Sequence, residues 1–279
     1  MKLSLAVQTP EAPERSPISL LSGSFDEMAA KAADWGADGL ELMPLDVTRL
    51  DPAEISATLA RHRLESCAVG TALFTILGGI TLLDPDAEKA ALAKERLFRA
   101  IEFASALGAP LLTIGGFRGR FSALGNDGRG RFIEILRRAG DFASLNKVRI
   151  VLEPINRYQS DGIASAAEGL QFLADLDHPS VGLLIDTCHM TMVESSWTEP
   201  FRQVMAAGKL WHVHLAESNR LPPGNGLVDF PAILNVLKEI GYNQHLTLEV
   251  FAKPDPDTAA REGLAYIRQL LAAGERNHP

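Results

Sequence analysis

The sequence has little cysteine, no excess of basic residues and no long apolar segment. Its 279 residues include only two cysteines, Cys67 and Cys188, which do not form a C-x-x-C pair. Two thiols are too few for a disulfide framework, so we expect both to be free in a reducing compartment. Lys and Arg number 27 against 35 Asp and Glu, which gives a net charge of −8. Because phosphate contacts need a clustered positive surface, this balance disfavours nucleic-acid binding and favours a small soluble substrate.

The N-terminal segment MKLSLAVQTPEAPER contains one short apolar run that stops at a proline and acidic residues. It fits neither a signal peptide nor a membrane span, so we expect a cytoplasmic protein that does not associate with a membrane. No Pro/Ser-rich linker, low-complexity run or sharp change of composition divides the chain. We therefore expect one domain over residues 1–279.

Short apolar runs alternate with longer amphipathic stretches along the whole chain. The expected strands are KLSLAVQ, DGLELM, LESCAVG, PLLTIGG, VRIVLEP, VGLLIDT, LWHVHLA and LTLEVF, beginning near residues 2, 38, 64, 110, 148, 181, 210 and 246. The expected helices cover residues 25–36, 52–62, 86–108, 127–146, 164–177, 198–208, 229–241 and 257–273. Each strand is thus followed by a helix, which gives eight βα units.

The type of strand and the number of units together predict the fold. Near-continuous apolar runs such as IVLE and GLLI are typical of strands covered on both faces, as in a parallel sheet. Helix signals support the boundaries: Asp51 with Pro52 and, later, Asp229 are placed to begin helices, and Gly108 is placed to end one. Eight βα units in a chain of this length are typical of an α/β fold of one kind, the (β/α)₈ TIM barrel.

Four consecutive expected strands each end at a residue that can bind a metal: Glu153, Asp186, His214 and Glu249. One such glutamate is more often solvated or ion-paired than a ligand. Four in succession are improbable by chance, and in a barrel they converge on the carboxyl-terminal mouth, where barrel enzymes keep their sites. Carboxylates and imidazole without cysteine favour a divalent ion, Mn²⁺ first, with Mg²⁺ or Co²⁺ as alternatives, over structural Zn²⁺.

Further polar residues are placed near this predicted centre. His212 lies on the same strand as His214 but deeper, so we expect a core or supporting histidine there and His214 as the ligand. His189 follows the sixth strand, in a loop above the metal, where it can bind a substrate hydroxyl or carbonyl. Arg220 begins a Pro/Gly-rich loop and either reaches over a bound ligand or is an exposed loop arginine. Glu41, at the end of the second strand, is either a substrate contact or an ion-pair partner.

The segment GGFRGRFSALGNDGRGR, after the fourth strand, is rich in glycine and arginine and suggests a phosphate cradle. It lacks both G-x-G-x-x-G and G-x-x-x-x-G-K-[ST]. Barrel phosphate sites usually use the loops after strands seven and eight. A phosphate group on the substrate is therefore not favoured.

At these motifs the sequence resembles the xylose isomerase-like barrel superfamily, specifically the ketose 3-epimerase group related to D-tagatose and D-psicose 3-epimerases. The motifs that carry the resemblance are LEPINRY, LLIDTCHM, HVHLAESNRLPPGNGLVDF and LEV, and the likeness spans nearly the whole chain. The segments AVGTALF and LLTIGGFRGR also resemble a 5-keto-gluconate epimerase branch. The resemblance implies a sugar substrate and a homo-oligomer, either a dimer or a tetramer.

The resemblance also implies roles for the site residues. The four strand-end residues would bind the metal, and Glu153 and Glu249 would double as acid and base. His189 and Arg220 would hold the substrate near its carbonyl end. Members of the group commonly have NRYE where this chain has NRYQ, so Gln159 replaces a charged substrate contact with a neutral amide. The substrate, or the reaction, is therefore expected to differ from the familiar epimerases.

The leading hypothesis is a divalent-metal-dependent sugar epimerase that inverts C3 of a ketose or keto-sugar acid. Two glutamates on opposite faces of a planar cis-enediolate would remove and return the proton. The same chemistry allows an aldose–ketose isomerase or a keto-glycoside lyase or dehydratase, and a non-catalytic sugar-binding barrel is the alternative outside enzymes. The endonuclease IV branch is disfavoured because it uses histidines from early strands, whereas His62 is the only histidine here before residue 178.

Overall fold

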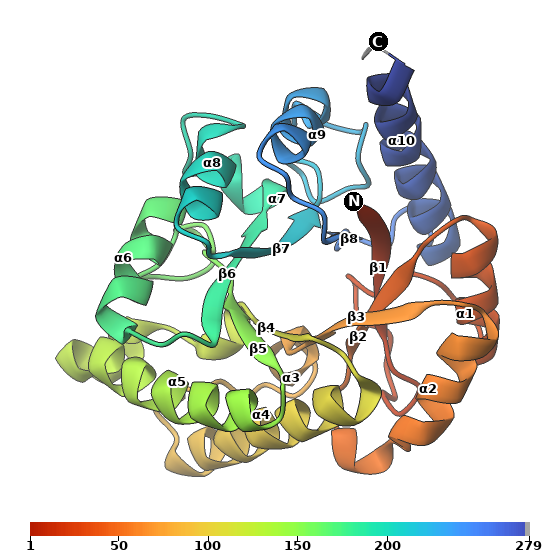
Figure 1. Cartoon of the computed structure of the whole chain (residues 1–279). Helices are drawn as coiled ribbons and strands as arrows, with labels where there is room; N and C mark the ends of the chain where they lie inside the picture. The colour runs from red at the N-terminus through yellow and green to blue at the C-terminus, as the bar shows by residue number, and fades with distance from the viewer. Residues whose placement is uncertain (277–279) are drawn as a thin grey trace.

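The computed structural model describes residues 1–276 and contains a closed barrel of eight parallel strands (Figure 1). Neighbouring strands follow chain order, and β8 closes the barrel by pairing with β1. The strands are β1 (Lys2–Gln8), β2 (Gly39–Met43), β3 (Glu65–Gly70), β4 (Leu111–Ile114), β5 (Arg149–Leu152), β6 (Val181–Asp186), β7 (Leu210–Leu215) and β8 (His245–Leu248). This arrangement confirms the predicted (β/α)₈ TIM barrel.

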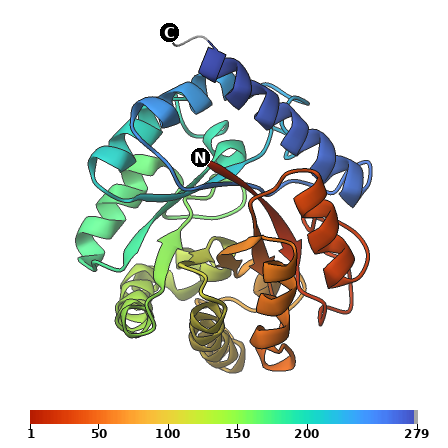
Figure 2. The same cartoon turned by 45° about the vertical axis from the view of Figure 1, so that its right-hand side comes forward.

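Helices surround the strands as an outer ring (Figures 1 and 2). The eight that connect successive strands or follow the last one are α1 (Phe25–Asp34), α2 (Pro52–Arg61), α4 (Ala87–Leu107), α5 (Gly128–Leu145), α6 (Ala166–Leu176), α8 (Glu199–Ala206), α9 (Phe230–Glu239) and α10 (Pro256–Arg276). All eight were predicted, with ends that differ by no more than about three residues.

Five short elements were not predicted. They are α3 (Ala72–Ile76), α7 (Thr187–Met190) and three 3₁₀ turns, η1 (Val47–Arg49), η2 (Gly116–Arg118) and η3 (Phe121–Asp127). None is long enough to show a helical period in the sequence, because each covers about one or two turns.

Capping side chains explain where the long helices begin and end. The Asp51 carboxylate accepts the Ala53 N–H at the start of α2, and Asp229 accepts the Ala232 N–H at the start of α9. Gly108 ends α4 with φ +69°, a left-handed conformation that favours glycine. The three predicted helix boundaries are therefore confirmed by their local chemistry.

The strands are covered on both faces, as their apolar sequences predicted. All six residues of β6 are buried, and the main core fills the layer between strands and helices. A smaller apolar cluster, which includes Cys67 and Leu184, fills the barrel interior. Both Cys67 and Cys188 are buried and free, and burial raises the pKa of the Cys67 thiol to about 12. Burial also raises the pKa of the Cys188 thiol to about 11, so neither thiol is ionised near neutral pH.

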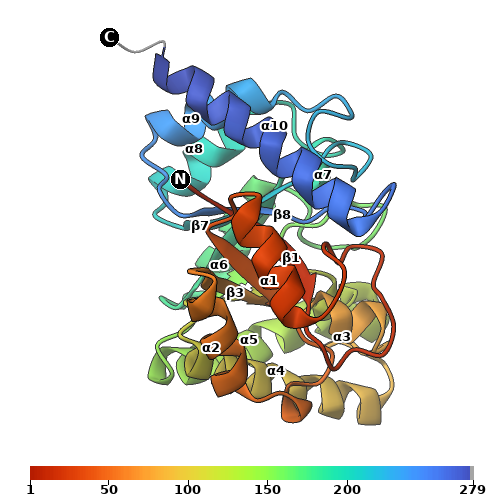
Figure 3. The same ribbon diagram turned by 90° about the vertical axis from the view of Figure 1, so that its right-hand side faces the viewer.

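The connections that follow the strands gather at one end of the barrel. Figure 3 shows α3 and α7 on the same side of the strands as the long loop after β1. The segments after β4 and β7, which carry Arg118 and Arg220, follow their strands in the same direction. Among residues 1–276, no helix combines the length and the apolar character needed to cross a bilayer.

Candidate active site

The four residues predicted at the strand ends lie together at the barrel mouth. Glu153, Asp186, His214 and Glu249 each offer one ligand atom, and these atoms lie within 4.8 Å of one another. All four side chains are buried. They come from, or directly follow, β5, β6, β7 and β8, so adjacent strands place them around one point. The expected convergence is therefore present in the structure.

Strand register aligns Asp186 with His214. The two residues are directly paired across β6 and β7. Asp186 Oδ1 accepts the backbone N–H groups of Cys188 (2.7 Å) and His189 (3.1 Å), which begins α7. Its other oxygen, Oδ2, lies 3.9 Å from His214 Nδ1, and Glu249 Oε2 lies 3.6 Å from the same nitrogen. The Nδ1 side of His214 thus faces the carboxylates.

The concentration of buried carboxylates shifts their pKa values. Burial raises the pKa of Glu153 to about 8, with further increases from the nearby charges of Glu249 and Asp186. Burial also opposes ionisation of Asp186 and Glu249, but Arg220 is the main group that holds the pKa of each below its usual range. The crowding of three carboxylates around one point therefore opposes ionisation of Glu153.

Two buried atoms at the site have no hydrogen-bond partner: Glu153 Oε1 and His214 Nδ1. An unpartnered buried polar atom is costly unless a ligand satisfies it. Three carboxylates and one imidazole are donors suited to a divalent cation, and a cation would also offset their charge. The residues present therefore fit the predicted metal.

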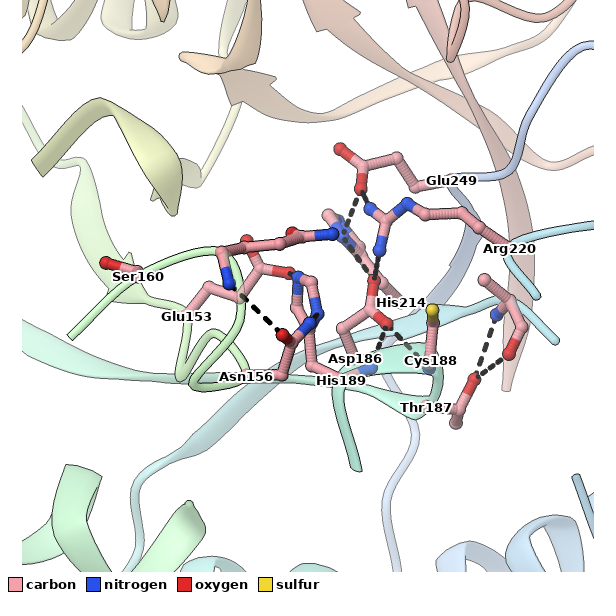
Figure 4. A network of polar contacts seen from close by, with 12 residues as sticks. Glu153, Asn156, Ser160, Asp186, Thr187, Cys188, His189, His214, Arg220 and Glu249 are labelled. Carbon is pink, nitrogen blue, oxygen red and sulfur yellow. Dashed lines mark hydrogen bonds and ion pairs between the residues drawn. The ribbon is translucent and has the colours of Figure 1, made fainter. Parts of the chain in front are cut away.

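Arg220 is not the exposed loop arginine of the alternative interpretation. Its side chain is only 12% exposed, and one guanidinium nitrogen lies 3.2 Å from Asp186 Oδ2 while the other is paired with Glu249 Oε2 (Figure 4).

The buried carboxylate of Glu217 accepts the N–H groups of Gly224 (2.9 Å) and Val228 (3.1 Å) and so folds the loop that carries Arg220. The position of Glu217 in the sequence did not indicate this role.

His189 lies at the mouth, but on the short helix α7 rather than in a loop. Its Nδ1 is 2.9 Å from Asn156 Nδ2, and its Nε2 is 3.5 Å from Glu153 Oε1 (Figure 4). Because the amide nitrogen donates, Nδ1 accepts and the proton lies on Nε2. Burial lowers the pKa of His189 to about 4, so the ring is neutral at physiological pH. Asn156 was missed; its only signal was its place in LEPINRY.

Gln159 belongs to the same loop as Asn156 but is exposed. Its backbone N–H donates to Asn156 Oδ1 (3.3 Å), and its carbonyl accepts from Arg120 (3.0 Å). These contacts fix the backbone of the loop and leave the side chain at the surface. A contact between Gln159 and substrate stays a prediction.

Glu41 lies below the mouth, inside the barrel. It is 1% exposed, and its Oε2 accepts from Nε2 of both His212 and His214 at 2.9 Å. Its Oε1 accepts from Thr113 Oγ1 at 3.1 Å. With both oxygens occupied by protein donors, Glu41 is the ion-pair partner rather than the substrate contact. His212 is fully buried, as expected for a histidine outside the ligand set.

The glycine- and arginine-rich segment after β4 contributes Arg118, which contacts the backbone of the loop after β5. Arg118 is fully buried and donates to the carbonyls of Glu153 (2.9 Å) and Ile163 (3.0 Å) and to Ser160 Oγ (3.1 Å). It thus holds the loop that carries Asn156 and is not a phosphate contact.

Gly115, in the same segment, lies directly against the catalytic candidate Glu153. A Cβ atom added at Gly115 would lie 2.1 Å from Glu153 Oε2. Only a residue without a side chain leaves room for this carboxylate in its observed position. This role of Gly115 could not be predicted from the sequence, because Glu153 follows the next strand.

Comparison with known proteins identifies a family and several similar proteins. Residues 29–270 match the family described as "Xylose isomerase-like TIM barrel". The L-ribulose 3-epimerase of Methylomonas sp. (strain DH-1) is 30% identical over 264 residues, covering 89% of this chain and 88% of its own. The 3-dehydro-D-guloside 4-epimerase of Escherichia coli (strain K12) is 31% identical over 120 residues, covering 43% of this chain and 45% of its own. A crystal structure of a D-allulose 3-epimerase from Methylomonas sp. has a TM-score of 0.76 at 25% identity, covering 96% of this chain and 98% of that one.

Proposed function

Because the chain belongs to the xylose isomerase-like TIM barrel family, we propose that it is a divalent-metal-dependent sugar epimerase acting on a ketose or keto-sugar acid at C3. The observation that carries this proposal is the pair of buried glutamates, Glu153 and Glu249, that belong to one cluster of metal-binding atoms. Epimerisation next to a ketone needs two proton-transfer groups and a means to stabilise negative charge on oxygen. The mouth offers both.

In the proposed mechanism, Glu153, Asp186, His214 and Glu249 hold the cation. A divalent cation supplies Lewis-acid stabilisation of the charge that develops on the substrate oxygens. Glu153 and Glu249 extend from β5 and β8 and would face opposite sides of the planar enediolate of the substrate. One glutamate removes the α-proton and the other delivers a proton to the opposite face, which inverts the carbon.

Neutral and cationic side chains around the mouth would orient the sugar. The Nε2–H of His189 points toward the Glu153 carboxylate. A substrate oxygen can accept the hydrogen bond from this Nε2–H in place of the carboxylate. Arg220 presents a guanidinium that can bind an oxygen carrying negative charge. Gln159, exposed on the rim, is the proposed contact for the far end of the sugar. Neutral Gln159 at this place favours a substrate different from those of enzymes with glutamate there.

We further propose Mn²⁺ as the metal, with Mg²⁺ and Co²⁺ as alternatives, because oxygen ligands dominate the set. The two buried free thiols support a location in a reducing compartment such as the cytoplasm. A dimer or tetramer is the proposed assembly. Size-exclusion chromatography with light scattering measures the assembly directly.

The test is a substrate and metal panel on protein first stripped with a chelator. Each of Mn²⁺, Mg²⁺ and Co²⁺ is added with D-fructose, D-tagatose, D-psicose, L-ribulose, 5-keto-gluconate or a 3-keto-glycoside, and products are followed by NMR in D₂O. We expect an epimer that is inverted at the carbon next to the ketone, C3 in a 2-ketose, and that carries deuterium there, with no turnover without metal. An aldose product would indicate an isomerase, and a released aglycone a lyase. Binding of sugar without exchange or turnover would contradict the proposal and indicate a sugar-binding barrel.

A further inference from the structure

A polar group of side chains lies inside the barrel directly below the mouth. We call it the floor cluster: Glu41, Thr113, His212 and Thr247. Every member is at least about nine-tenths buried. The Glu41 carboxylate is its centre, because it accepts from two histidines and one threonine, and Thr247 Oγ1 lies 3.1 Å from His212 Nε2. Burying polar groups this deep in a barrel core costs free energy of folding, so we ask which function they serve.

His214 connects the floor cluster to the mouth through the two nitrogens of one ring. Its Nε2 lies 2.9 Å from Glu41 Oε2, whereas its Nδ1 faces Glu249 Oε2 at 3.6 Å and Asp186 Oδ2 at 3.9 Å. Although burial opposes ionisation of Glu41, His214 and His212 hold its pKa well below its usual range. Nε2 of His212 and Nε2 of His214 both lie 2.9 Å from Glu41 Oε2, so this oxygen accepts and Nε2 of His214 carries the proton of its hydrogen bond.

The floor cluster is better explained as a hydrogen-bond network than as a second metal site. Glu41, His212 and His214 do offer ligand atoms within 4.8 Å of one another. However, both imidazoles approach the same carboxylate oxygen at 2.9 Å, which is a hydrogen-bond distance, and Thr113 occupies the other oxygen. An ion at this place would need both Nε2 protons removed. The geometry therefore favours donors bonded to Glu41.

We propose that Glu41 is a positioning residue for the metal site at the mouth, acting through His214. By accepting the Nε2 proton, Glu41 fixes the ring orientation and the tautomer in which the Nδ1 lone pair is directed at the other three ligands. This inference rests on the metal site of the proposed function, but it does not depend on which sugar is the substrate.

The main test measures Mn²⁺ binding to chelator-stripped protein by calorimetry, for the wild type and Glu41→Gln. Glutamine keeps the size of the side chain but removes the charge, and its amide can donate to Nε2 and so move the imidazole proton to Nδ1. We expect one ion per chain in the wild type and an affinity about 10- to 100-fold weaker in the variant. We also expect the electron-spin-echo signal from ¹⁴N coupled to Mn²⁺ to weaken, because that coupling reports the His214 nitrogen.

Two further variants separate positioning from general stability. Tyr242→Phe removes a buried hydrogen bond to the carbonyl of His245 that involves neither Glu41 nor the mouth, and we expect its Mn²⁺ affinity and ¹⁴N coupling to match the wild type. Thr113→Val is nearly isosteric and removes one hydrogen bond to Glu41 Oε1. We expect it to weaken Mn²⁺ binding about two- to tenfold. If Glu41→Gln fails to fold, Thr113→Val decides the matter.

The outcomes distinguish this inference from the proposed function. If folded Glu41→Gln binds Mn²⁺ as tightly as the wild type, the positioning role is overturned. If Glu41→Gln is unfolded, wild-type affinity in Thr113→Val overturns it. Both conclusions hold even if sugar turnover is normal. Two Mn²⁺ ions per wild-type chain, with one lost in Glu41→Gln, overturn it in favour of a second metal site. Absence of sugar turnover with the expected Mn²⁺ affinities overturns the epimerase proposal and leaves the role of Glu41 supported.

Discussion

The floor cluster and the mouth of the barrel both bury glutamates, yet their surroundings shift the glutamate pKa in opposite directions. Burial opposes ionisation in both places. In the floor cluster, His214 and His212 outweigh it and lower the pKa of Glu41, whereas at the mouth burial and two neighbouring carboxylates raise the pKa of Glu153 to about 8. The supply of donors, rather than depth, decides whether a buried carboxylate is ionised. Both oxygens of Glu41 are satisfied by donors from within the chain, whereas the mouth is suited to a cation from outside.

The largest effect is expected from removing proton transfer at the mouth. Glu153→Gln and Glu249→Gln should each reduce turnover by about 10²- to 10⁴-fold, because a neutral amide neither removes nor returns a proton. Turnover and deuterium incorporation at the inverted carbon are measured at saturating metal. Glu262→Gln, at an exposed position on α10, is the matched control. Substantial deuterium exchange in both mouth variants would contradict the two-glutamate mechanism.

A stability comparison tests the difference between floor and mouth directly. Glu41→Gln should destabilise metal-free protein by about 3 kcal/mol, because two buried imidazoles lose an ionised acceptor. Glu153→Gln should stabilise it, because one of three crowded carboxylates is removed. Urea denaturation at pH 8 measures both free energies of unfolding. Destabilisation of similar size in the two variants would mean that the two regions do not differ in this way.

Gly115 and Gly116 provide a matched pair of substitutions beside the mouth. Gly115→Ala places a Cβ atom 2.1 Å from Glu153 Oε2 unless the carboxylate moves, whereas a Cβ at Gly116 meets nothing within 4 Å. A displacement of about 1 Å can cost about 100-fold in rate, so we expect a loss of that order for Gly115→Ala. Gly116→Ala should retain wild-type turnover. Equal kcat values for the two variants would show that the position of Glu153 does not limit the reaction.

The smallest predicted effect is a pH dependence of stability in metal-free protein. The pKa of Glu153 is raised from 4.5 to about 8 on folding, so the folded state binds this proton more tightly. Its stabilising contribution is complete below pH 4.5 and is lost as pH rises toward 8, by about 2 kcal/mol between about pH 6 and pH 8. Urea denaturation across this range should show the decline in wild type and a weaker one in Glu153→Gln. Parallel profiles would exclude Glu153 as the cause.

Most of the fold could be predicted because its signals are local. The apolar runs marked all eight strands, and capping residues such as Asp51 and Gly108 marked helix ends through contacts within a few residues. The four mouth residues could also be predicted from the sequence, because each lies at the end of its own strand and barrel closure brings strand ends together. The short helices α3 and α7 left no comparable pattern.

The partners of buried polar residues could not be predicted in the same way. Glu41 and His214 are 173 residues apart in the sequence, and Arg118 and the carbonyl of Ile163 are 45 apart. Side-chain periodicity indicates which face of a strand a residue occupies, but not which atom of a distant strand lies opposite. The same limit explains why Glu41 had two open interpretations and why Gly115 and Asn156 had no assigned role.

By itself, the sequence determined the order of strands and helices, the closed barrel that this order builds, and the set of donors at the ends of strands five to eight. These follow from periodicity, capping and chain order, which act over short distances along the chain. Only the tertiary structure decided that Glu41 lies below the mouth and holds His214, and that Gly115 leaves room for Glu153. Those relations depend on register and packing between strands, where displacements of an ångström decide which atoms meet.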